Sequence, residues 1–190
     1  MPSFTAGGSP INIELLQLTM NLLTILSNLA VSCWLGGTAL FTFLLTPILF
    51  RTYSRDMAGN IVGLLFPGYF RWGIACGIIA LLCQLINRSR YALASMLIIG
   101  AMLLLTSLQA FVIEPRAAEL KQAIGSFETT AQDHPLRKKF RTLHSLSMAA
   151  NLAVIAGGVI LVILSSLPSQ GTSHSSKLEQ PNPPQQTLQR

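Results

Sequence analysis

Three long segments of this chain contain no Asp, Glu, Lys or Arg, and this absence of charge limits what the chain can fold into. The segments are residues 15–50, 91–113 and 142–176. A helix needs about 20 predominantly apolar residues to cross the hydrocarbon core of a bilayer, so each segment is long enough for one crossing. A chain in hydrocarbon must satisfy its own backbone hydrogen bonds, which a helix does within a single segment. The segments therefore predict a helical membrane protein.

The overall composition supports the membrane class and argues against nucleic-acid binding. Of the 190 residues, 51% are hydrophobic and 11% are charged, whereas about 25% are charged in an average soluble domain. The formal net charge of +6 arises mainly from Lys and Arg in the expected connectors, and no basic helix interleaved with aromatic residues is present. We expect the lipid bilayer as the main partner, with no nucleic acid. Association into a homo-oligomer or with a membrane partner protein stays open.

The predicted fold is an all-α membrane protein, a four-transmembrane-helix antiparallel bundle formed by residues 15–167. The spans are expected at about residues 18–43, 66–86, 91–113 and 143–167. Pro67 suits the first turn of the second span, and Tyr69, Phe70 and Trp72 are expected to form an aromatic belt at the membrane interface. Their composition predicts that residues 1–14 form a flexible tail and that residues 168–190 form a disordered tail.

The distribution of cations predicts the orientation of the bundle. The two long connectors carry nine of the Lys and Arg residues, and the opposite side carries four, two of them in the C-terminal tail. Cytoplasmic loops carry an excess of cations, so the connectors are expected in the cytoplasm and both termini outside. The membrane would be a plasma membrane or a bacterial inner membrane. Arg88 and Arg90, in the short hairpin between the second and third spans, favour the opposite orientation.

The segment that opens the fourth span, residues 137–151, joins a basic collar to a polar helical face. Four cations within five residues precede the charge-free run, and His144, Ser147 and Asn151 then recur on one side of the expected helix. Polar groups that face hydrocarbon are costly, so this side is expected to point at other helices.

A carboxylate and an arginine end the third span on the side where the fourth span begins. Glu114 is therefore expected to meet Arg141 or His144, because a buried carboxylate is costly unless it is paired. The candidate functional polar cluster comprises Glu114, Arg116, Arg141, His144, Ser147 and Asn151. Two interpretations stay open, a structural ion-pair latch and a gate for protons or a substrate.

No catalytic residue is predicted, and the protein is not expected to be an enzyme. His144 is the only histidine near a predicted span, and neither an HExxH nor a CxxC motif occurs. Cys76 and Cys83 lie seven residues apart on one helix, about 10 Å and too far for a disulfide, so free thiols are expected. Imidazole and thiolate groups bind haem iron or copper, which makes His144, Cys76 and Cys83 weak metal candidates. No cofactor is expected, with haem or copper as the alternative.

Four motifs resemble those of the transmembrane-protein-205-like family, which includes the domain of unknown function 4149. They are Trp34–Phe50 with its Gly36-Gly37 pair, LFPGYF at Leu65–Phe70, VIEPRAAEL at Val112–Leu120 and FRTLHSLSMAANL at Phe140–Leu152. The similarity extends over roughly residues 20–167 and omits both tails. The resemblance implies four spans and a membrane location, and a more distant likeness to four-span copper-resistance membrane domains. It implies no established reaction.

These observations predict a multi-pass integral membrane protein with a small transport, permeation or accessory role. A haem- or copper-binding membrane protein that uses His144 is one alternative, and a structural partner subunit is the other.

Overall fold

The computed structural model describes residues 10–86 and 91–166. The predicted C-terminal tail, the hairpin at residues 87–90 and residues 1–9 lie outside the described residues. The elements are α1 (Pro10–Ala39), η1 (Leu40–Leu45), α2 (Thr46–Thr52), α3 (Arg55–Ile86), α4 (Ala92–Leu108), η2 (Gln109–Ile113), α5 (Glu114–Ile124) and α6 (Pro135–Ser166). The two η elements are π-helical turns within longer helices. No strand occurs in the described ranges.

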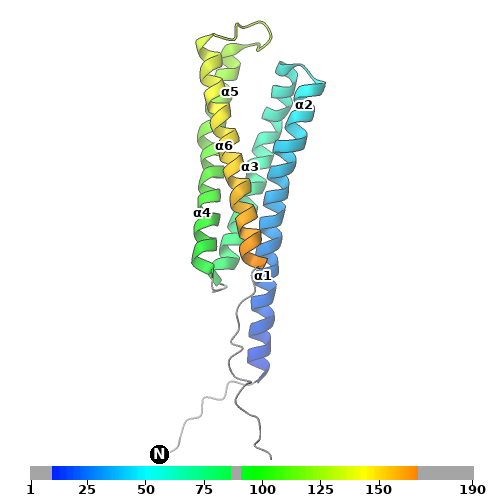
Figure 1. Cartoon of the computed structure of the whole chain (residues 1–190), viewed down its shortest axis with the longest axis vertical. Coiled ribbons are helices and arrows are strands. Elements are labelled where there is room, and N and C mark those ends of the chain that lie inside the picture. Colours follow the sequence, from blue (N-terminus) through cyan, green and yellow to red (C-terminus); the bar gives the residue numbers. More distant parts are fainter. Residues whose placement is uncertain (1–9, 87–90, 167–190) are drawn as a thin grey trace, which may run out of the picture.

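These elements form four long antiparallel rods, which confirms the predicted four-helix bundle (Figure 1). α1, η1 and α2 run as one rod, and α4, η2 and α5 run as another. α1 and α4 each pack against both α3 and α6, so the four rods enclose a common core. All four rods are long and apolar enough to cross a membrane. The chain is therefore a multi-pass membrane protein.

The helices extend beyond the predicted spans, because hydropathy detects the hydrocarbon-crossing part and not the helix ends. α3 has 32 residues and begins at Arg55, so it is about 48 Å long and exceeds the roughly 30 Å hydrocarbon core. Pro67 therefore lies inside α3 and not in its first turn. The prediction of an aromatic belt is wrong for Phe70, which is buried, and for half-buried Tyr69, whereas Trp72 is exposed. At the other end, α1 begins at Pro10, inside the segment expected to be a tail.

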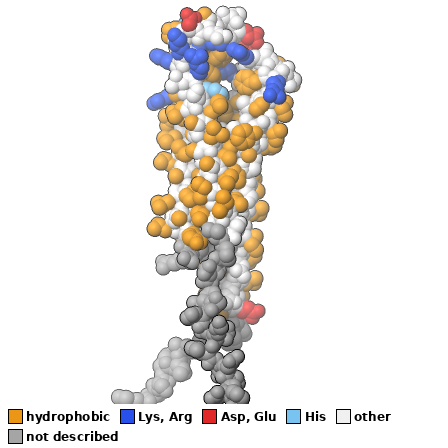
Figure 2. Space-filling model, in the orientation of Figure 1, with side chains coloured by type: hydrophobic (Ala, Val, Ile, Leu, Met, Phe, Trp, Pro, Cys, Tyr) orange, Lys and Arg blue, Asp and Glu red, His pale blue; other side chains and the backbone are white. Residues whose placement is uncertain are grey.

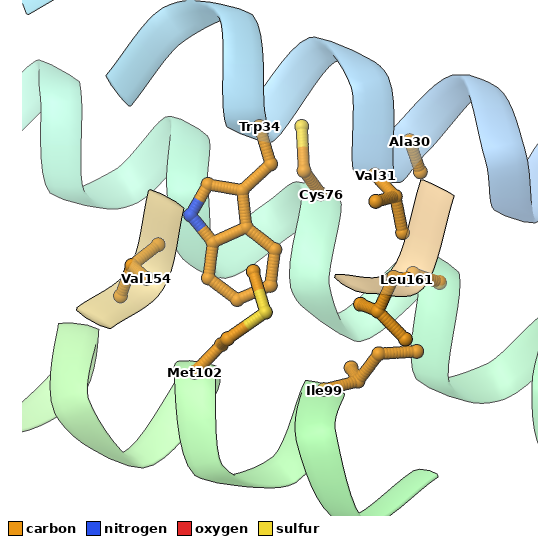
Figure 3. Close-up of a cluster of buried hydrophobic side chains, with 9 residues drawn as sticks. Ala30, Val31, Trp34, Cys76, Ile99, Met102, Val154 and Leu161 are labelled. Carbon is orange, nitrogen blue, oxygen red and sulfur yellow. The ribbon is translucent and has the colours of Figure 1, made fainter. Parts of the chain in front are cut away.

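An apolar core holds the four rods together in the half of the bundle away from the connectors. Figure 3 shows its side chains. Trp34 of α1 lies at its centre, with Cys76 of α3, Met102 of α4 and Val154 of α6 in the same cluster. Gly77 of α3 lies so close to this cluster that an added Cβ would be 2.6 Å from the Trp34 ring. Small residues at such positions let helix backbones approach closely, which is how helices associate in lipid.

The rods pair differently at the end that carries residues 53–54 and 125–134, here called the connector end. There α2 packs on α3 and α5 packs on α6 (Figure 1). Asp56 of α3 links the two pairs, because its carboxylate accepts hydrogen bonds from Ser126 Oγ at 2.6 Å and from Phe127 N–H at 2.7 Å. Figure 2 shows Lys and Arg gathered at the connector end, above a surface covered by hydrophobic side chains. Such a surface suits contact with lipid chains below and with water and headgroups above.

Candidate functional site

A cavity of about 420 Å³ lies at the connector end between α3, α5 and α6, and it is here called the interhelical cavity. Its polar lining includes Glu114 and Lys121 of α5 and His144 and Ser147 of α6. Its apolar lining includes Phe66 of α3. Ionisable groups on helices that span a membrane are rare and usually functional. The cavity is therefore the candidate functional site.

The π turn η2 positions the polar groups of the third rod. In an α-helix, residues five apart would lie about 140° apart around the axis. In η2 the N–H of Glu114 instead donates to the carbonyl of Gln109, an i→i+5 bond that places the two residues one above the other. Pro115 follows directly. Proline has no N–H, and in a regular α-helix its ring would clash with the carbonyl four residues earlier. The wider π turn before Pro115 relieves this clash. Both Gln109 and Glu114 thereby face the interior of the bundle.

A π turn followed by a proline also occurs in the first rod, where η1 precedes Pro47. There the N–H of Thr46 donates to the carbonyl of Phe41, again an i→i+5 bond. Each π turn also contains a buried polar atom without a hydrogen-bond partner in the described structure, Oγ1 of Thr42 and Nε2 of Gln109. π turns and unpaired buried polar groups both concentrate at functional sites.

A layer of hydrogen-bonded side chains lies between the interhelical cavity and the apolar core. Ser147 Oγ donates to Gln109 Oε1 at 2.9 Å, and the Gln109 side chain is only 1% exposed. Next to this pair, Tyr69 OH donates to Asn151 Oδ1 at 3.1 Å. The core around Trp34 then fills the space between the rods. This layer and the core separate the interhelical cavity from the other end of the bundle.

An acidic and a basic side chain share the interhelical cavity without forming a direct ion pair in the described structure. Glu114 and Lys121 are both half-buried and attract each other electrostatically. Lys121 reaches across to α3, where an added Cβ on Gly59 would be 3.5 Å from its Nζ. Partly buried charges that lack a close partner are costly. The cavity therefore offers a carboxylate and an ammonium group to a bound molecule.

The structure brings together only part of the predicted polar cluster. Glu114, His144 and Ser147 line the interhelical cavity. Arg141 lines a separate hollow beside His144, and Arg116 lies on the outer surface of α5 next to Lys139. Asn151 belongs to the hydrogen-bonded layer below the cavity.

Of the two partners expected for Glu114, His144 lines the same cavity. No ion pair joins Glu114 to Arg141 among the described residues, and the charged side chain that acts on Glu114 is Lys121. The π turn explains this result, because it rotates Glu114 inward relative to a regular helix. Lys121 lies beyond the charge-free segment of the third span, and its seven-residue spacing from Glu114, two helical turns, is the signal in the sequence that places both on one helical face.

The candidate metal ligands lie apart from one another. His144 is at the connector end, whereas Cys76 and Cys83 are buried in the lower part of α3. Within residues 10–86 and 91–166, no three His, Cys, Asp or Glu side chains are grouped as a metal site. The described cysteines are free thiols, as expected from their spacing.

Comparison with known proteins identifies related chains but no related structure. The family described as "Domain of unknown function (DUF4149)" matches residues 29–126, which include Glu114 and Lys121. An uncharacterized protein of Aquifex aeolicus (strain VF5) is 33% identical over 135 residues, covering 70% of this chain and 90% of that protein. No solved structure matches the chain. The four long helices of this chain thus enclose a cavity with acidic and basic side chains at one end, and the chain belongs to the DUF4149 family.

Proposed function

We propose that this protein binds a small polar solute in the interhelical cavity as part of a transport or accessory role in the membrane. The observation that carries the proposal is an acidic and a basic side chain, half-buried Glu114 and Lys121, in one cavity of about 420 Å³. Small-molecule sites have volumes of roughly 300–1,000 Å³. The residues provide the chemistry to hold both ends of a zwitterion.

The properties of the lining select the class of solute. Glu114 can accept hydrogen bonds from an ammonium group, and Lys121 can donate to a carboxylate. His144 and Ser147 add further polar contacts, and Phe66 provides an apolar wall. A solute that carries both an ammonium and a carboxylate would compensate both protein charges at once. An amino-acid-sized zwitterion is therefore the favoured ligand class.

The layer of hydrogen-bonded side chains below the interhelical cavity favours solute binding over an open channel. The pair formed by Ser147 and Gln109, and then the core around Trp34, separate the interhelical cavity from the opposite end of the bundle. Passage of a solute would require the rods to rearrange. The π turns η1 and η2 lie near this hydrogen-bonded layer, and each is followed by a proline. Helices bend preferentially at such positions.

The orientation proposed for the bundle places the interhelical cavity on the cytoplasmic side. All nine cations of the two long connectors lie in the described residues, and Figure 2 shows Lys and Arg gathered at that end. Reporter fusions after Arg55 and after Phe127 are expected to behave as cytoplasmic, and a fusion within residues 168–190 as exterior. The reverse pattern would mean that Arg88 and Arg90 determine the orientation.

Solute binding can be tested by thermal unfolding of the detergent-purified full chain. A bound ligand at 100 times its Kd stabilises a protein by about 2.7 kcal/mol, which raises Tm. We expect a rise in Tm with amino acids, a smaller rise with their amides or decarboxylated amines, and none with uncharged alcohols. Glu114→Gln should abolish the response to amines, and Lys121→Met should abolish the response to carboxylates.

Two exposed residues outside the cavity provide matched controls. Glu119→Gln and Lys139→Met make the same charge changes on α5 and α6, and both positions face the outer surface. These variants should retain the full response to amino acids. Equal responses in Glu114→Gln and Glu119→Gln, or no rise in Tm with any of these solutes, would refute the proposal.

A further inference from the structure

A second hollow, of about 250 Å³, lies at the connector end beside the interhelical cavity and is here called the basic hollow. Three arginines line it, Arg55 at the start of α3 and Arg137 and Arg141 on α6. His144 lies between the two hollows and lines both. No Asp or Glu is among the described residues that line the basic hollow. It is therefore a site of concentrated positive charge.

One wall of the basic hollow is held rigidly by Arg137. Its Nη1 donates to the carbonyl of Phe127 at 2.9 Å and also to the carbonyl of Thr130. The guanidinium carbon lies 5.6 Å from the centroid of the Phe127 ring, a cation–π contact. Phe127 in turn packs on Phe140 with ring centroids 4.8 Å apart. The loop that contains Phe127 and Thr130 is thus tied to α6 at this hollow.

The other two arginines are available for a ligand. Arg55 and Arg141 are exposed, and neither forms a hydrogen bond or ion pair in the described structure. Asp56, the acid next to Arg55, is already engaged by Ser126 and Phe127. Glu128 borders an adjoining shallow hollow with Arg55 but is exposed and forms no ion pair with it in the described residues. Two guanidinium groups therefore face one hollow without a competing partner.

The chemistry and position of the basic hollow point to a phosphate group. The planar guanidinium fork of arginine matches phosphate oxygens in two-point hydrogen bonds. The hollow lies where the charge-free segments of the rods end, which is the depth of lipid headgroups. Basic pockets between membrane helices on the cytoplasmic side bind the headgroups of anionic lipids. We propose that the basic hollow binds the phosphate of an anionic phospholipid through Arg55 and Arg141.

The residues proposed to bind the lipid differ from those proposed to bind the solute in the interhelical cavity. Arg55 and Arg141 do not line that cavity, and Glu114 and Lys121 do not line the basic hollow. His144 joins the two sites, with its ring parallel to that of Phe140 at a centroid distance of 6.3 Å.

The experiment titrates fluorescent short-chain phosphatidylglycerol and phosphatidylcholine into the detergent-purified full chain. We expect phosphatidylglycerol to bind at least tenfold more tightly than phosphatidylcholine. The double variant Arg55→Gln/Arg141→Gln should lose that preference. The control Arg116→Gln/Lys139→Gln, which removes the same charge from exposed positions outside the basic hollow, should keep it. All four side chains are exposed, so neither variant removes buried packing.

Three results would overturn the proposal. The first is equal binding of the two lipids by the unaltered chain, and the second is an equal loss of preference in both double variants, which would indicate general charge attraction. The third is displacement of phosphatidylglycerol by inorganic phosphate at an equal phosphate concentration, which would identify a free-phosphate site. Failure of the lipid site would leave the response of Tm to amino acids intact, so the two proposals are tested separately.

Discussion

Trp34→Ala is expected to lower the free energy of unfolding by about 3–5 kcal/mol, the range seen when a large buried aromatic side chain is truncated. Trp34 is 2% exposed and lies in the cluster that joins all four rods, with Met102 of α4 opposite (Figure 3). In lipid the loss is one of packing, since interiors and lipid chains are similarly apolar. Unfolding in mixed micelles with increasing dodecyl sulfate would measure the change.

The control for this substitution is Trp72→Ala on α3. Trp72 is 53% exposed on the outer surface, and its only described hydrogen bond is a long one, 3.5 Å from Nε1 to the carbonyl of Cys33. We expect Trp72→Ala to cost about 1 kcal/mol or less. Equal costs for the two tryptophans would show that Trp34 does not hold the bundle together.

Gly77→Ala is expected to destabilise the bundle by about 1–3 kcal/mol through overpacking. A Cβ on Gly77 would lie 2.5 Å from Cδ2 of Leu103 and 2.6 Å from Cζ3 of Trp34. The end of Leu103 can move aside, but the Trp34 ring is enclosed by the core. The α1–α3 approach must therefore widen, which weakens packing along both helices.

Gly100→Ala makes the same change where an added Cβ meets no atom within 4 Å. This control lies in α4, and it should be neutral or stabilising by about 0.5–1 kcal/mol because alanine favours the helix more than glycine does. Opposite signs for the two substitutions in the same unfolding assay would support the packing shown by the structure. A neutral result at Gly77 would contradict the close α1–α3 contact.

Local composition was enough to predict the number of crossings and the class of fold. The charge-free segments, for example residues 91–113, are apolar over a bilayer thickness, and this property does not depend on neighbouring helices. The gathering of cations at one end follows as well, because alternate connectors of an antiparallel bundle lie on the same side. Membership of the DUF4149 family was also predicted from short motifs and is confirmed.

The makeup of the candidate site depended on rotation about the helix axes, which hydropathy does not determine. A regular α-helix would put Thr106, Gln109, Ile113 and Arg116 on one face. The π turn η2 breaks that periodicity, so Glu114 turns inward while Arg116 stays outside. The helical end of the third rod likewise carries Lys121 into the interhelical cavity, although the sequence placed it in a connector.

The sequence by itself determined that this chain crosses the membrane four times and concentrates its cations at one end. Only the tertiary structure decided which polar groups meet, because a contact such as Ser147 with Gln109 joins residues 38 positions apart. Such contacts depend on helix bending, on close approach at Gly77 and on the tie from Asp56 to Phe127. Each of these features results from packing between helices. The sequence of one helix alone does not specify how it packs against the others.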